Sequence, residues 1–125
     1  GRLDSAALQE LTARARVSAL PARWLENQPL AVLESYAAQV PVVASALGGL
    51  PELVDASTGT LVGPDDPAAL AAALGRYLDD PEMAVAHGLG GRARVLRDHA
   101  PEVHLRRVAN LYSDVRIAHA AGSAA

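Results

Sequence analysis

Three short apolar runs alternate with segments of helical character, and this alternation restricts the fold more than any other feature. The runs cover residues 17–20, 40–44 and 58–62, and the third is the weakest because Gly59 interrupts it. Their apolar character and their proline or glycine boundaries are typical of buried strands. Strands that alternate with helices predict a parallel sheet with right-handed crossovers. The sequence therefore predicts the α/β class, with three parallel strands, flanking helices and a helical C-terminus.

Prolines and acidic residues mark the expected helix starts. Helices are expected to begin near residues 5, 29, 51, 67, 81 and 101. A proline fits the first helical position, because its missing N–H is not needed there. Asp4 or Ser5 is expected to cap the first helix. Asp65 or Asp66, and Asp80, precede such prolines and are expected to cap helices rather than to bind a cation. The tail over residues 119–125 is expected to fray.

The strand count indicates part of a larger domain. The 125 residues suffice for one domain, yet a doubly wound nucleotide-binding domain uses roughly six strands. Residues 1–125 are therefore expected to be part of one larger α/β domain. The strand at 17–20 would then lack a neighbour, and we expect a partner chain or further polypeptide of the same protein to cover its edge. Gly1 stands where an initiator Met would be expected, so we expect the start to reflect truncation or processing.

Composition excludes several function classes. A net charge of −3 and only one Trp and three Tyr, none interleaved with basic residues, argue against nucleic acid as a partner. The chain has no cysteine, which excludes disulfides and is typical of a reducing compartment. No apolar run approaches the ~20 residues that cross a bilayer. We expect a cytoplasmic location, with peripheral membrane attachment through other regions of the protein as an open alternative.

Metal and hydrolase chemistry find no support in the motifs. The four histidines match no zinc-ligand spacing and are interpreted as surface or packing residues. The sequence contains no Asp-x-Asp triplet, so no metal site is expected. Ser45 and Ser57 lie outside any nucleophile-elbow pattern.

Two glutamates flank the expected helix start at Pro29. Glu26 precedes that start and Glu34 follows it by little more than one helical turn. The free N–H groups and the positive dipole end of a helix start suit a phosphate. Carboxylates on either side of a phosphate can accept hydrogen bonds from sugar hydroxyls. A phosphate site flanked by two such carboxylates is a physical description of a nucleotide-sugar site. On spacing alone, two solvated charges are the favoured interpretation, because pairs of glutamates eight positions apart are common.

A set of linked motifs runs through the chain in a fixed order. They are Pro21-Ala22, Glu26, Glu34-Ser35, Val-Pro-Val-Val-Ala-Ser at 40–45, Gly-Gly-Leu-Pro-Glu-Leu-Val at 48–54, and Thr-Gly-Thr-Leu-Val-Gly-Pro at 58–64. Together they resemble the family 4 retaining glycosyltransferases, also called group 1, and the resemblance covers nearly the whole chain. It implies a GT-B enzyme, of which this chain would be the second half of the Rossmann-like, donor-binding C-terminal domain.

The resemblance also implies roles for individual residues. The activity would be retaining transfer of a sugar from a nucleotide diphosphate to a hydroxyl of a glycan, lipid or small molecule, without metal or other cofactor. Glu26 would contact the donor sugar at the anomeric centre as the catalytic residue. The implied donor-binding residues are Glu34 on the ribose, Asn27 and Gln28 beside the sugar, the Leu30 and Ala31 amides on the phosphates, and Gly48 and Gly49. Gly48 and Gly49 either approach the donor or only make a turn. Trp24 is expected to pack the loop that carries Glu26.

Some positions depart from the family pattern. Pro29 stands where many members have Gly and offers no amide, and Ala22 replaces Ser. Gln39 replaces a Gly, which costs of order 1 kcal/mol if that turn needs a positive φ. In the family, an Arg and a Lys that neutralise the diphosphate come from an earlier portion, and the acceptor site comes from an N-terminal domain. We therefore expect weak donor binding by these 125 residues and no activity without those parts.

Two other functions stay open on the sequence. Gln39 departs from the family pattern, and the family's two cationic residues do not occur in this sequence. Both observations are compatible with a non-catalytic fragment or assembly module. An isomerase or phosphorylase on the same fold is the third interpretation.

Overall fold

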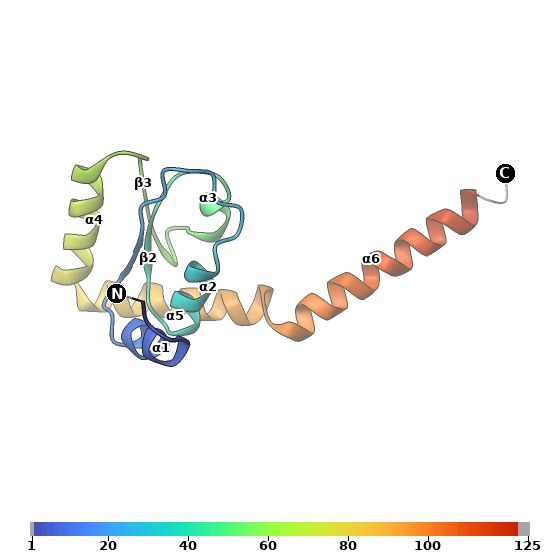
Figure 1. The fold of residues 1–125 in the computed structure, drawn as a ribbon, viewed down its shortest axis with the longest axis horizontal. Helices are drawn as coiled ribbons and strands as arrows, with labels where there is room; N and C mark the ends of the chain where they lie inside the picture. Colours follow the sequence, from blue (N-terminus) through green and yellow to red (C-terminus); the bar gives the residue numbers. More distant parts are fainter. Residues whose placement is uncertain (1, 123–125) are drawn as a thin grey trace.

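A parallel three-stranded sheet forms the centre of the computed structural model, which describes residues 2–122 (Figure 1). Its strands are β1 (Ser18–Leu20), β2 (Val42–Ser45) and β3 (Gly59–Val62), in the order β1-β2-β3. The register places Val43 opposite Ala19 on one side and Thr60 on the other. The predicted α/β class and all three strands are confirmed.

Strand β2 begins two residues later than predicted. The Val40 amide donates to the Ser35 carbonyl at 2.9 Å, which closes the turn after the preceding helix. Pro41 has no N–H, and its carbonyl accepts from Ser18 at 2.9 Å. The ladder with β3 therefore starts at Val42.

Helices cover both faces of the sheet, as a parallel sheet requires. Helix α2 (Leu30–Ala37) and the short α3 (Leu50–Leu53) lie on one side, and α4 (Pro67–Asp79) lies on the other (Figure 1). Successive strand residues point to opposite faces. Val42 and Ala44 accordingly pack with α2 and α3, whereas Val43 packs with α4 and the start of α5 (Pro81–Asp98).

Aspartates cap three helices, as the sequence predicts. Asp4 accepts from the Ala7 amide at 2.8 Å at the start of α1 (Ser5–Ala13). The corresponding bonds at α4 and α5 run from Ala69 to Asp66 at 2.8 Å and from Met83 to Asp80 at 2.9 Å. Of the two candidates before α4, Asp66 is therefore the cap.

Helix α6 (Pro101–Gly122) extends away from the sheet and its covering helices (Figure 1). The backbone is helical to Gly122, and the rest of the tail expected to fray, residues 123–125, lies outside the described residues. None of the helices in the described range is both long and apolar enough to cross a membrane.

The free side of β1 matches the expected edge. Within residues 2–122, β1 pairs with β2 alone. A chain or segment that covers this edge stays a prediction.

Candidate functional site

The start of α2 presents free backbone N–H groups. Pro29 is the N-cap with φ −68° and ψ 122°, so it stands one residue before the helix rather than at its first position. No side chain caps this end, and no hydrogen bond from the Leu30 or Ala31 amide occurs within the described part of the chain. Helix starts of this kind combine free donors with the positive end of the dipole. The N-terminal end of α2 can therefore bind an anion.

Glu26, in the loop before α2, is held by its neighbour Trp24. The indole Nε1–H donates to Glu26 Oε1 at 2.6 Å. Trp24 is 64% exposed, so it supports this loop through a hydrogen bond and not through the packing that we expected. The Glu26 side chain is half-buried.

Gly48 and Gly49 lie against the backbone of the Glu26 loop. The Gly49 amide donates to the Glu26 carbonyl at 2.6 Å. Gly48 has φ +60°, and a Cβ there would meet the Glu26 amide nitrogen at 2.8 Å. A Cβ on Gly49 would overlap the Asn27 carbonyl oxygen. These glycines thus allow the loop at residues 48–49 to pack closely against the loop that carries Glu26. This role was not predicted from the sequence. The Gly-Gly pair is the sequence signal that indicates a close approach of two backbones.

Gln28 connects the same loop to the C-terminal helices. Its Nε2 lies 3.2 Å from Nδ1 of His99, which is the C-cap of α5. Asn27 beside it is exposed. His99 was missed from the sequence, because its partner is 71 positions away and no local motif links the two.

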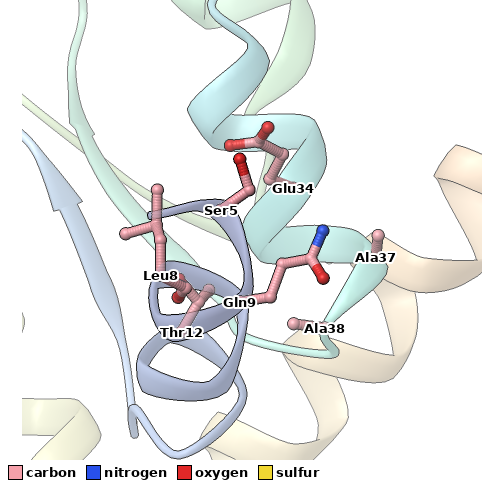
Figure 2. A pocket seen from close by; sticks show the side chains of 7 residues that line it. All are labelled: Ser5, Leu8, Gln9, Thr12, Glu34, Ala37 and Ala38. Atoms are coloured by element: carbon pink, nitrogen blue, oxygen red, sulfur yellow. The ribbon is translucent and has the colours of Figure 1, made fainter. Parts of the chain in front are cut away.

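Glu34 lies over a cavity of about 360 Å³ between α2 and α1. Ser5, Leu8, Gln9 and Thr12 of α1 line one side, and Glu34, Ala37 and Ala38 line the other (Figure 2). Glu26 does not line this cavity. The two glutamates therefore have different neighbours, and the start of α2 is the element between them in the chain.

Comparison with known proteins decides the family. Residues 1–80 match the family of glycosyl transferases group 1. The chain belongs to this glycosyltransferase family. It is 35% identical over 117 residues to a GDP-mannose-dependent monoacylated alpha-(1-6)-phosphatidylinositol monomannoside mannosyltransferase of Corynebacterium glutamicum, covering 89% of this chain and 31% of that protein.

Solved structures agree with this assignment. Sucrose-phosphate synthase from Thermosynechococcus elongatus superposes with a TM-score of 0.84 at 36% identity, over 94% of this chain and 30% of that one. The C-terminal domain of a group 1 glycosyltransferase from Francisella tularensis matches with a TM-score of 0.72 at 23% identity, over 81% of this chain and 52% of that one. The predicted fold, part of a GT-B C-terminal domain, is confirmed. The chain spans about a third of the mannosyltransferase.

Buried polar contacts fix α2 in this glycosyltransferase chain. The Tyr36 hydroxyl lies within hydrogen-bond distance of the Leu53 carbonyl, at 3.1 Å, and of Thr58 Oγ1, at 2.9 Å. Burial raises the pKa of Tyr36 to about 12. Ser35 Oγ lies 2.9 Å from Ser18 Oγ of β1. These contacts hold the helix whose first amides form the candidate site.

Asp55 and Arg94 support the loop after α3. Arg94 Nη1 lies 2.6 Å from Asp55 Oδ2, and Nη2 donates to the Glu52 carbonyl at 2.6 Å. The Ser57 hydroxyl is the largest cause of the lowered pKa of Asp55. Burial opposes it, and the Ser57 amide and Arg94 lower the pKa further. Among the described residues, no group of three or more histidine or acidic side chains could hold a metal ion.

Gln39, which replaces a Gly of the family pattern, adopts a backbone conformation that is unfavourable for any residue other than Gly. Its φ is 61°, in the left-handed region. The condition stated from the sequence is therefore met, and Gln39 carries a cost of order 1 kcal/mol relative to Gly. This strain lies in the turn after α2, at the opposite end of the helix from the Leu30 and Ala31 amides.

Proposed function

We propose that this chain is the donor-binding part of a retaining GT-B glycosyltransferase, which transfers a sugar from a nucleotide diphosphate to an acceptor hydroxyl. The observation that carries the proposal is the uncapped start of α2, whose Leu30 and Ala31 amides follow Glu26 and precede Glu34. The name of the mannosyltransferase relative, which states dependence on GDP-mannose, supports the donor class.

Each part of the site has a task in the proposed reaction. The departing diphosphate gains negative charge as the glycosidic bond breaks, and preorganised amides of Leu30 and Ala31 stabilise that charge. Glu34 accepts hydrogen bonds from the ribose. Glu26, held by Trp24, contacts the donor sugar on the side of the anomeric carbon.

The remaining functions belong to the whole protein. Cationic residues for the diphosphate and the binding site for a glycan, lipid or small-molecule acceptor are proposed to come from other regions. Charge-assisted contacts to phosphate contribute about 1.5–3 kcal/mol each. Donor binding by this chain should therefore be weak.

Calorimetric titration of the chain with GDP, UDP and ADP tests the proposal. We expect saturable binding of at least one nucleotide with a Kd on the order of 1 mM. Glu34→Ala should weaken it by about tenfold, because ribose hydroxyls lose a charged acceptor. Glu10→Ala, an exposed glutamate on α1 that pairs with Arg14, is the matched control and should change nothing. Absence of saturable binding, or equal effects of the two variants, would favour the non-catalytic module.

A further inference from the structure

Helix α5 passes along α2 and brings its last residue to the loop before that helix. Close to the C-terminal end of α2, the Arg92 guanidinium donates to the Ala37 carbonyl. Val95, further along α5, packs against the core cluster that includes the buried apolar residues of α2. His99, the C-cap of α5, then lies beside Gln28, just before the N-terminal end of α2. The packing of the two helices therefore delivers an imidazole to the candidate site.

Backbone hydrogen bonds fix His99 at the junction of α5 and α6. Its amide donates to the Val95 carbonyl at 2.9 Å. The carbonyl of the next residue, Ala100, accepts from the amides of Val103 and His104, each at 3.0 Å, at the start of α6. The half-buried ring of His99 is thus attached to a backbone that is hydrogen-bonded on both sides.

The contact between the two side chains defines which way the Gln28 carboxamide faces. Gln28 Nε2 lies 3.2 Å from Nδ1 of His99. An amide nitrogen donates and does not accept, so Nδ1 is the acceptor and the ring is neutral, with its proton on the other nitrogen. The carboxamide oxygen then faces away from the ring and can accept a hydrogen bond from a ligand hydroxyl.

Protonation of His99 would reverse this arrangement. A protonated imidazole carries an N–H at both nitrogens and accepts at neither. The ring and the Gln28 amide group would then present donors to each other, and the carboxamide has to turn so that its oxygen accepts from Nδ1–H. Its NH₂ group would take the place of the oxygen on the side away from the ring. Histidine is the side chain whose charge ordinarily changes between about pH 5 and 8.

The charged groups near His99 are already paired or do not titrate in that range. On α5, the first two turns of α6 and the Glu26 loop they are Arg97, Asp98, Glu102, His104, Arg106, Arg107 and Glu26. Asp98 lies 2.7 Å from Arg97 and 4.0 Å from Arg107, and the hydrogen bond from Arg97 is the largest cause of its lowered pKa. Asp98 therefore stays ionised above pH 5, and the only second histidine of this set is the exposed His104.

We propose that His99 is a positioning residue for the donor sugar. In its neutral form it holds the Gln28 carboxamide with the oxygen directed to a sugar hydroxyl, and its protonation turns the carboxamide and weakens that contact. The proposal rests on the proposed function, because Gln28 stands directly before Pro29 and close to the Leu30 amide that is proposed to bind the diphosphate. His99 acts through Gln28 and takes no part in the bond-breaking step.

NMR titrations of the ¹⁵N-labelled chain with GDP-mannose and GDP, and with UDP-glucose and UDP, test this role. The nucleotide is common to both members of a pair, so the ratio of the nucleotide's Kd to that of the nucleotide sugar reports the sugar contact. In a pair that binds, His99→Ala should reduce this ratio by about threefold to fivefold at pH 8, because the Gln28 acceptor is no longer held. His99→Asn should restore the ratio, since Asn Oδ1 can accept from Gln28 in place of Nδ1.

The pH profile separates this role from a merely structural one. Between about pH 8 and about pH 5, the ratio should fall by about threefold in the unaltered chain relative to His99→Asn. Comparing the two at the same pH cancels the titration of the ligand phosphates. His104→Gln, which changes an exposed histidine of α6, should keep the unaltered profile. In a Gln28→Ala background, His99→Ala should have no further effect.

Three results would each overturn the proposal. They are an unchanged ratio in His99→Ala, a pH profile of His99→Asn that equals that of the unaltered chain, and an equal effect of His99→Ala with and without Gln28. If GDP or UDP still shifts the Leu30 and Ala31 amides in such a case, the proposed function stands. If no nucleotide shifts these amides, the role of His99 and the proposed function both fail.

Discussion

The indole nitrogen of Trp24 lies 2.6 Å from a carboxylate oxygen of Glu26, two residues further along the same loop. The Glu26 backbone packs against Gly48 and Gly49, and its carbonyl accepts a hydrogen bond from the Gly49 amide. The glutamate proposed to contact the donor sugar is thus held at both its backbone and its side chain.

Replacing Trp24 by Phe separates this hydrogen bond from the bulk of the ring. The variant should weaken nucleotide-sugar binding by roughly fivefold, or about 1 kcal/mol, because Glu26 loses its donor. The free energy of unfolding should change by less than about 0.5 kcal/mol, since the ring is largely exposed. Calorimetry with GDP-mannose and urea denaturation measure the two effects. Leu25→Ala in the same loop, also an exposed side chain, should leave both unchanged; unaltered binding in Trp24→Phe would contradict the role of the bond.

Gln39 offers a test of backbone strain. With φ at 61°, Gln39→Gly should raise the free energy of unfolding by about 0.5–1 kcal/mol, because Gly accepts this conformation without cost. Ala38→Gly, one residue earlier with φ −85°, should lower it by a similar amount. Urea denaturation of both variants gives the signs, and a loss of stability in Gln39→Gly would show that the turn is not strained.

Two glycines within helices should respond in opposite ways to alanine. A Cβ on Gly91 of α5 would meet Cγ of Tyr36 at 2.7 Å, whereas nothing lies within 4 Å of one on Gly75 of α4. Gly91→Ala should therefore destabilise the chain by about 1–3 kcal/mol. Gly75→Ala should stabilise it by about 0.5–1 kcal/mol through helix propensity. Thermal and urea unfolding of the pair check this, and similar effects of both would refute the close contact between α5 and Tyr36.

The buried Tyr36 predicts a loss of stability at high pH. Its pKa is about 12 in the folded chain against an ordinary value of 10.0, with burial as the main cause. Between these values the unfolded chain releases a proton that the folded chain keeps, so the free energy of unfolding falls as pH rises. Burial raises the pKa of Tyr77 as well and adds to the slope. Urea denaturation from about pH 8 to about pH 11 should show a smaller slope in Tyr36→Phe, while Tyr112→Phe on α6 should retain the full slope.

Local patterns predicted most of the fold. Prolines stand at the first position of α4, α5 and α6, and aspartates cap α1, α4 and α5. These helix starts depend on contacts over three residues or fewer, which the sequence displays directly. The same holds for the positions of Glu26 and Glu34 around the start of α2. The limits of some elements moved: at β2 the turn after α2 uses the Val40 amide, and α2 begins one residue after Pro29.

Contacts between distant residues could not be predicted in this way. His99 reaches Gln28 across 71 positions, and Arg23 pairs with Asp65 because the ends of β1 and β3 lie at one edge of the sheet. The support that Gly48 gives to Glu26 likewise depends on how two loops pack. No local periodicity encodes such contacts, since they follow from the assembled sheet.

A crystal structure of the chain with GDP-mannose tests most directly whether a diphosphate binds at the start of α2. We expect phosphate oxygens within about 3 Å of the Leu30 and Ala31 amides, with Glu34 on the ribose and Glu26 beside the mannose. A diphosphate bound elsewhere on the chain, with those two amides facing solvent and both glutamates apart from the ligand, would contradict the proposed function.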